Sequence, residues 1–227
     1  MPVITISRQF AAAGGPIAKA LAERFGAELL DREIVAQVAA RAGLTEAEAE
    51  GYDERLPGLW QRIVAALAMG GPDPSLPPLP ADLMPATAVH ERLAQLTRAV
   101  IEEAAARGNA VILGRGGAYI VARGRDVLHV QLHAPLEARI RYLLTRVEEI
   151  PADTRPDEPS LRELCRTFDA RRAEYVKRTF GKEWLDPEGY DLSIDTGSMG
   201  VEVAVDLIEM AARRHAPAAF RPGRLPR

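Results

Sequence analysis

The fold of this chain is decided by residues 3–22, VITISRQFAAAGGPIAKALA. The apolar run at 3–6 is typical of a buried β-strand, and the apolar spacing from Ile17 onward is typical of an amphipathic helix. The turn between them predicts a phosphate-binding loop, because its backbone N–H groups and the helix N-terminus can converge on an anion. The predicted cradle consists of Ala11, Ala12, Ala13, Gly14, Gly15 and Pro16.

This loop departs from the pattern G-x-x-x-x-G-K-[ST], in which a lysine reaches the β- and γ-phosphates and a hydroxyl binds Mg²⁺. Aligned with that pattern, Arg8 and Ala13 take the two glycine positions, Gly14 takes the lysine position and Gly15 the hydroxyl position. On these residues alone, an ordinary strand-to-helix turn is the simpler interpretation. Our hypothesis is that Arg8, at the end of the first strand, replaces the missing lysine.

Composition narrows the class of protein. A chain of 227 residues with 47% hydrophobic residues can bury one sizeable core, which predicts a single domain at 1–215 and a flexible tail at 216–227. The net charge of −3 argues against a dedicated nucleic-acid or membrane-surface binder. Cys165 is the single cysteine, which excludes an internal disulfide framework and favours a reducing compartment. We therefore expect a soluble cytoplasmic protein without a signal peptide.

Short apolar runs alternate with helical patterns along the chain, which predicts an α/β three-layer fold around a parallel sheet. We expect strands at 3–6, 28–30, 110–113, 127–133 and 191–194, and helices at 15–25, 32–42, 57–69, 86–107, 136–150, 160–180 and 199–215. Residues 70–85 contain six prolines and form a loop within an inserted helical block at 31–107. A second proline-rich segment, 150–160, is expected to form a lid.

Several segments, taken in their order along the chain, resemble the cytidylate kinase-like family of P-loop nucleoside monophosphate kinases. They are ITISRQ at 4–9, LDREI at 30–34, VILGRGGAYI at 111–120, Asp169-x-x-Arg172 and YDLSIDT at 190–196. The resemblance implies a P-loop NTPase-like fold with five parallel strands and a nucleotide on the first loop. It also implies a monophosphate-binding insertion, an arginine-rich lid, and ATP and Mg²⁺ as cofactors.

The same resemblance assigns roles to particular residues. Arg115, flanked by Gly114 and Gly116, matches the position that clamps the acceptor phosphate; the alternative is a surface arginine in a tight turn. Arg172 is the best lid candidate, with Asp169 orienting it, and Arg139 is the second. Asp31 and Arg32 are candidates for the acceptor site. Asp31 can also bind Mg²⁺ through water or cap the following helix.

Three functions remain open at this stage. The first is an atypical kinase that phosphorylates CMP, dCMP or a related acceptor with arginines in place of the lysine. The second is a pseudo-kinase that binds a nucleotide or another phosphorylated ligand, and the third is an interaction protein whose loop binds nothing. Leu113 stands where the family carries an aspartate that organises Mg²⁺, which favours weak catalysis. Nucleotides are the expected partners, and the chain is expected to be a monomer or homodimer.

Overall fold

The computed structural model of this chain describes residues 2–31, 86–147 and 155–214. These residues form a five-stranded sheet in the order β2-β3-β1-β4-β5, in which every neighbouring pair is parallel. The strands are β1 (Val3–Arg8), β2 (Glu28–Leu30), β3 (Ala110–Leu113), β4 (Val127–His133) and β5 (Leu192–Asp195). The predicted α/β three-layer, P-loop NTPase-like fold is confirmed. Three strand ranges are as predicted, while β1 extends to Arg8 and β5 begins one residue later than expected.

Helices flank this sheet at positions that mostly follow the predicted pattern. They are α1 (Gly14–Phe25), α5 (Ala86–Arg107), α6 (Gly117–Ile120), α7 (Leu136–Val147), α8 (Glu158–Phe180) and α9 (Thr196–Arg214), with a 3₁₀ turn η1 (Pro187–Gly189). The single turn α6 was not predicted, because four residues are too few to show helical periodicity. The predicted helices at 32–42 and 57–69, the loop at 70–85 and the tail at 216–227 lie outside the described residues.

The start of α9 differs from the prediction for an identifiable reason. The prediction placed it at Met199, whereas the helix begins at Thr196. The Asp195 carboxylate accepts hydrogen bonds from the backbone N–H of Gly197 at 2.9 Å and of Ser198 at 3.3 Å, which stabilises an early first turn. At Gly200 the backbone leaves helical geometry with φ 77°, so this first turn and the rest of α9 are joined by a kink.

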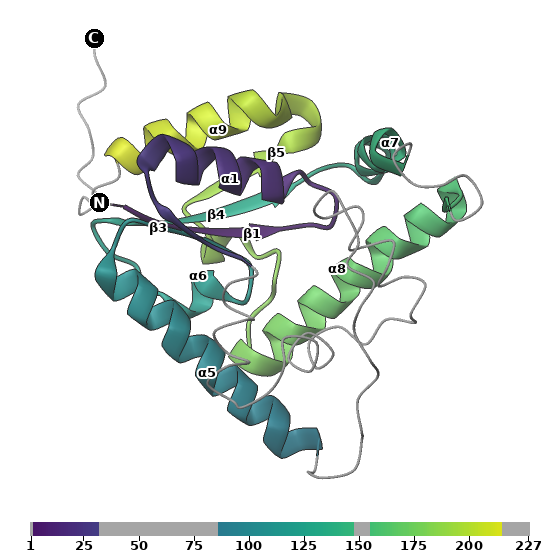
Figure 1. Ribbon diagram of the computed structural model, residues 1–227. Coiled ribbons are helices and arrows are strands. Elements are labelled where there is room, and N and C mark those ends of the chain that lie inside the picture. Colours follow the sequence, from purple (N-terminus) through teal and green to yellow (C-terminus); the bar gives the residue numbers. More distant parts are fainter. Residues whose placement is uncertain (1, 32–85, 148–154, 215–227) are drawn as a thin grey trace, which may run out of the picture.

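The two faces of the sheet are covered by different helices (Figure 1). Helices α1 and α9 pack on one face, where Ile17 and Leu21 are fully buried in a cluster with Ile4 and Ile6 of β1. Helix α5 packs on the other face, where Ile101 and its neighbours contact Ile112. Burial on both faces explains why the strands read as nearly continuous apolar runs. Among the helices in the described ranges, none is long and apolar enough to cross a membrane.

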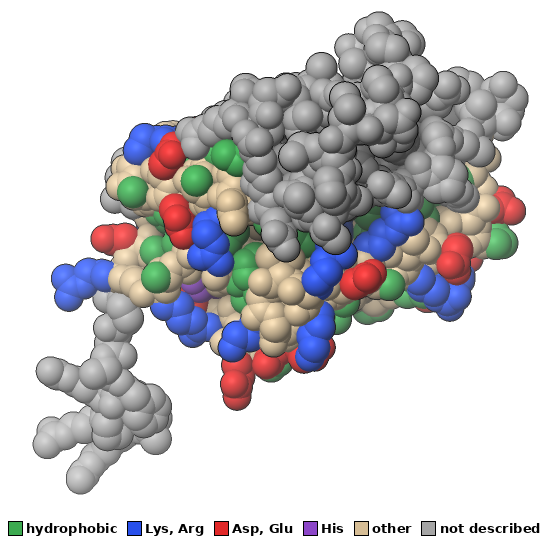
Figure 2. Space-filling model, turned by 90° about the horizontal axis from the view of Figure 1, so that it is seen from below, with side chains coloured by type: hydrophobic (Ala, Val, Ile, Leu, Met, Phe, Trp, Pro, Cys, Tyr) green, Lys and Arg blue, Asp and Glu red, His purple; other side chains and the backbone are tan. Residues whose placement is uncertain are grey.

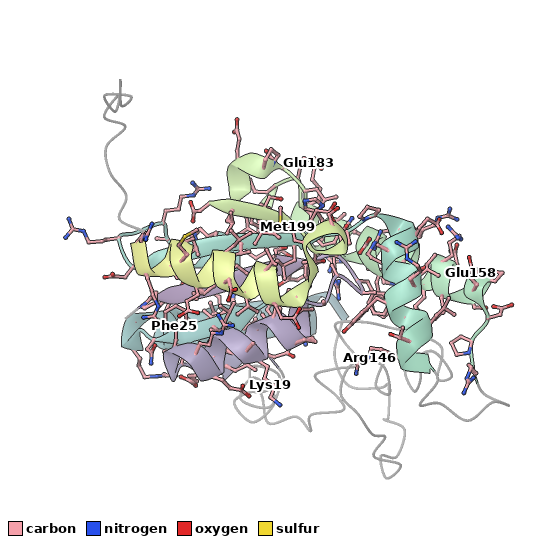
Figure 3. The ribbon with its side chains drawn as sticks, turned by 90° about the horizontal axis from the view of Figure 1, so that it is seen from above. Lys19, Phe25, Arg146, Glu158, Glu183 and Met199 are labelled. Carbon is pink, nitrogen blue, oxygen red and sulfur yellow. The ribbon has the colours of Figure 1, made fainter. Side chains whose placement is uncertain are left out.

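The carboxyl ends of the parallel strands meet at one edge of the sheet, and this edge carries the candidate site. The turn into α1 follows β1, and the turn into α6 follows β3. Beyond this edge, α7 and α8 pack against each other (Figures 1 and 3). Side chains from α7 and α8 therefore reach the loops that follow the strands.

Candidate functional site

The loop between β1 and α1 has an unusual backbone. Ala11 and Ala13 lie in the left-handed region, with φ of 62° and 54°. Non-glycine residues adopt this region at a cost, so the surrounding structure must hold them there. Within the described chain no hydrogen bond is made by the backbone N–H groups of Ala11, Ala13, Gly14 and Gly15. Gly14 and Gly15 begin α1, where N–H groups have no intrahelical acceptor. This set of amides can hold an anion.

Side chains from three other elements hold the loop by its carbonyl groups. Arg172 of α8 donates to the carbonyl of Arg8 at 3.0 Å, and Arg139 of α7 donates to that of Phe10 at 3.2 Å. The Thr196 hydroxyl donates to the carbonyl of Ala12 at 3.2 Å. These three side chains bond to carbonyl groups of the loop, so they do not compete with a ligand for the amides of residues 11–15 that make no hydrogen bond.

The side chain of Arg8 runs across the start of α1 to the end of β3. A Cβ added to Gly14 would lie 2.7 Å from Cγ of Arg8, and one added to Gly114 would lie 1.9 Å from its Nη1. Glycine is therefore required at both positions for Arg8 to lie where it does. The guanidinium group stands beside the loop at the carboxyl edge of the sheet, which is where the hypothesis of a lysine replacement needs a cation.

A small cavity of about 50 Å³ brings three of the four predicted catalytic arginines together. Its lining is Ile6, Ser7, Arg8, Gly114, Arg115, Gly116, Gly117, Ala118, Tyr119, Arg172, Tyr175, Val176 and Trp184. Arg115 has φ 54° and lies between Gly114 at 80° and Gly116 at 73°, so three successive left-handed residues shape this wall. Burial raises the pKa of Tyr175, and the positive charge of Arg115 opposes that shift.

The fourth predicted arginine, Arg139, lies behind the loop and does not line this cavity. Its side chain is 8% exposed and pairs with the Asp169 carboxylate at 2.6 Å. The other oxygen of Asp169 accepts from the backbone N–H of Phe10 at 2.8 Å. The prediction that Asp169 orients Arg172 therefore misses the contacts that this carboxylate makes with Phe10 and Arg139.

Three hydroxyl groups and an indole under the cavity form a network that the sequence reasoning missed. Ser7 accepts from Trp184 Nε1 at 2.9 Å, and Tyr190 donates to the carbonyl of Trp184 at 2.7 Å. The hydroxyls of Tyr119 and Tyr190 are 2.9 Å apart. Burial raises the pKa of both tyrosines, so both are neutral donors at physiological pH. Trp184 packs at the cavity wall and is 5% exposed.

Other predicted groups lie away from the cavity or outside the description. Lys19, the first lysine after the loop, was not predicted to act there; it is exposed and 4.0 Å from Glu23, on the outer side of α1 (Figure 3). Asp31 follows β2 and is half-buried, whereas Arg32 lies outside the described residues. Leu113 is buried in the hydrophobic core. Within the described ranges, no group of three His, Cys, Asp or Glu residues could hold a metal ion.

Two further observations bear on the sequence predictions. Cys165 is buried, and burial raises the pKa of its thiol to about 11, so the thiol is protonated at neutral pH. On the face of the molecule drawn in Figure 2, Lys and Arg side chains are interspersed with Asp and Glu side chains among the coloured residues. Charges of one sign therefore form no large patch there.

Comparison with known proteins adds a family and a structural relative. The family model described as the cytidylate kinase-like family matches residues 3–198. An uncharacterized protein from Eubacterium ventriosum has a similar crystal structure, with a TM-score of 0.65, 18% identity, and coverage of 94% of this chain and 99% of that one. The shikimate kinase of Bacteroides thetaiotaomicron has a TM-score of 0.47 with 13% identity, over 93% of this chain and 98% of that one.

One curated relative matches only part of this chain. Over 122 residues, or 53% of this chain, it is 34% identical to a protein named uronate isomerase from Corynebacterium glutamicum. The match spans 22% of that protein's length, about a fifth.

Proposed function

This chain belongs to the cytidylate kinase-like family, and we propose that it is a nucleoside monophosphate kinase that uses arginines in place of a loop lysine. In this proposal it transfers the γ-phosphoryl group of ATP to CMP, dCMP or a related acceptor. Its partners are nucleotides, and it acts in the cytoplasm as a monomer or homodimer.

The observation that carries this proposal is the arrangement of Arg8, Arg115 and Arg172 around one cavity beside the loop. The cavity has a volume of about 50 Å³, and all three arginines belong to its lining. Arginine suits this position because its guanidinium is permanently charged and can bind two phosphate oxygens at once. We assign Arg115 to the acceptor phosphate, and Arg8 and Arg172 to the charge on the group in transfer.

The proposed reaction breaks the bond between the γ-phosphorus of ATP and its bridging oxygen, and forms a bond to a phosphate oxygen of the acceptor. The products are ADP and the diphosphate of the acceptor. The loop amides of Ala11, Ala13, Gly14 and Gly15 bind the phosphates of the donor, and the arginines neutralise charge on the equatorial oxygens. Mg²⁺, when bound, would supply positive charge against the phosphates, and Asp31 at the same edge of the sheet is the residue that would hold it through water.

A second candidate function is a nucleotide-binding protein that does not transfer phosphate. Two observations favour it: Gly14 occupies the lysine position, and Leu113 is buried where a carboxylate would organise Mg²⁺. Loss of a group that stabilises the transition state typically lowers the rate by two to three powers of ten. Such a protein would retain the loop amides and the arginine cavity and bind without turnover.

The test is incubation with ATP, Mg²⁺ and CMP, with ADP formation as the readout. Turnover in the wild type, and a loss of about 10²-fold or more in Arg115→Ala, would support the kinase proposal. The control is Arg125→Ala, because Arg125 is exposed and precedes β4 at the opposite edge of the sheet. If no ADP forms, thermal unfolding with and without nucleotide separates the two candidates, since binding to the folded state must raise Tm. No turnover and no shift would reject both.

A further inference from the structure

Asp169 of helix α8 bonds to the loop between β1 and α1, and its carboxylate also pairs with Arg139. Asp169 divides its two oxygens between the backbone N–H of Phe10, at 2.8 Å, and the Arg139 guanidinium, at 2.6 Å. The same guanidinium donates to the carbonyl of Phe10 at 3.2 Å. The backbone N–H and the backbone carbonyl of Phe10 are therefore both held by one ion pair.

Aromatic packing also holds Phe10 against helix α8. The ring of Phe10 stacks on that of Phe168, with centroids 4.5 Å apart and an interplanar angle of 11°. The Arg172 guanidinium lies 5.9 Å from both ring centroids. Phe168, Asp169 and Arg172 lie within one turn of α8, so a single helix face holds the loop before its first left-handed residue.

The ion pair is placed where it can control the shape of the loop. Ala11, the residue after Phe10, has φ 62°, and Ala13 has φ 54°. An alanine stays in the left-handed backbone region only while contacts with the rest of the protein hold it there, so we expect it to leave that region when those contacts are lost. If Phe10 shifts, we expect the backbone of Ala11 and Ala13 to shift with it, which would change the positions of their amides relative to those of Gly14 and Gly15.

We propose that Asp169, held by Arg139, is a positioning residue that sets the anion-binding conformation of residues 8–15 without touching the ligand. This inference rests on the proposed function for its ligand, a nucleotide polyphosphate. In this proposal Asp169 acts on the loop at residues 8–15, which binds the phosphates of the donor, and Arg139 holds the Asp169 carboxylate in place. The side chains of Asp169 and Arg139 are 17% and 8% exposed, which fits an internal support better than a ligand contact.

The experiment compares Asp169→Asn with Asp191→Asn in the full chain. The control is matched, because Asp191 accepts from the backbone N–H of His129 at 2.8 Å, pairs with Arg123 at 3.2 Å and is 15% exposed, but precedes β5 at the opposite edge of the sheet. Two readouts are taken: hydrogen exchange of residues 8–15 in the protein without ligand, and the dissociation constant for ATP with Mg²⁺. We expect loop exchange to rise about tenfold in Asp169→Asn, while residues 110–113 keep wild-type protection. We expect ATP affinity to fall at least about tenfold, and Asp191→Asn to change neither readout.

The double variant Asp169→Asn with Arg139→Met covers the case in which the single variant does not fold. It leaves no unpaired buried charge, so it tests the loop in a folded protein. Because both residues act on Phe10, we expect the double variant to raise the exchange of residues 8–15 about tenfold over wild type, the same change that is expected of Asp169→Asn.

The outcomes separate the two proposals. Faster loop exchange together with weaker ATP binding supports the positioning role. Folded variants with wild-type exchange overturn it, and so does weaker binding with unchanged exchange, which would make Asp169 a direct ligand contact. If the wild type binds no ATP, the proposed function fails, but the exchange of residues 8–15 still decides whether Asp169 sets the loop.

Discussion

Two adjacent glycines in the first turn of α1 allow a matched test of the position of Arg8. A methyl group at Gly14 would lie 2.7 Å from Cγ and 3.2 Å from Cβ of Arg8, whereas one at Gly15 would have nothing within 4 Å. Carbon atoms pack best at about 3.5–4.0 Å, so the alanine at 14 would overlap Arg8 by roughly 1 Å. The same substitution is therefore permitted at one position and obstructed at the next.

The magnitudes follow from these distances. Replacing glycine by alanine at a helical position stabilises by about 0.5 kcal/mol, since the unfolded chain loses freedom. Gly15→Ala should keep that gain. In Gly14→Ala an overlap with Cβ and Cγ, the atoms nearest the backbone, costs about 1–3 kcal/mol. We expect the free energies of unfolding of the two variants to differ by about 2 kcal/mol, with Gly15→Ala the more stable.

Urea unfolding measures this difference, and kcat in the ADP assay measures its consequence. Gly14→Ala should lose about 10²-fold in kcat, because Arg8 can no longer reach Gly114, whereas kcat in Gly15→Ala should stay within about threefold of wild type. Equal stability in the two variants would refute the placement of Arg8 against Gly14. A destabilised Gly14→Ala with wild-type kcat would refute the role of Arg8 in catalysis.

Three further predictions concern the same edge of the sheet and the core beside it. Gly114→Ala should destabilise by about 2–3 kcal/mol in urea unfolding and weaken ATP binding, because φ is +80° and the new Cβ would lie 1.9 Å from Arg8 Nη1; normal stability would contradict this. Asp195→Ala should cost about 1 kcal/mol through loss of the α9 cap. Because bonds from Ser198 and nearby backbone groups lower the pKa of Asp195 in the folded state, this contribution is present above its ordinary value of 3.8. It is lost as the pH falls through the lower folded pKa, so stability curves of wild type and variant should converge in acid. Cys165 should react with a disulfide reagent at pH 8 only after unfolding, since burial raises its pKa to about 11; rapid labelling of the native protein would contradict this.

The fold could be predicted from the sequence because each buried parallel strand is a short apolar run between helical patterns. Nothing in that pattern indicates α6, whose single turn depends on the left-handed backbone at Gly116. The first turn of α9 was missed because a side-chain cap at Asp195 stabilises it, and a kink at Gly200 separates it from the longer helix that the apolar spacing predicts. Local hydrogen bonds decided these boundaries, and hydrophobic periodicity does not report them.

The site could be predicted in part for a related reason. Arg8 ends β1 and Arg115 follows the neighbouring strand β3, so parallel topology alone places them at one edge. The sequence ranked Arg172 above Arg139, but it could not predict which of them pairs with Asp169, because both lie on helices rich in arginine. In the structure Asp169 pairs with Arg139 behind the loop, and Arg172 lines the cavity.

The alanines of the loop explain why those helix contacts matter. Two left-handed alanines cost about 1–2 kcal/mol each, whereas glycine would adopt the same backbone without this penalty. Four side chain–backbone hydrogen bonds, from Asp169, Arg139, Arg172 and Thr196, offset that cost at about 1 kcal/mol each, and more where the group is charged. The conformation of this loop is therefore a property of α7, α8 and α9 as much as of its own sequence. The proposed anion binding by this loop therefore requires those helices to stay docked, and we expect movement of α8 to change the affinity for phosphate.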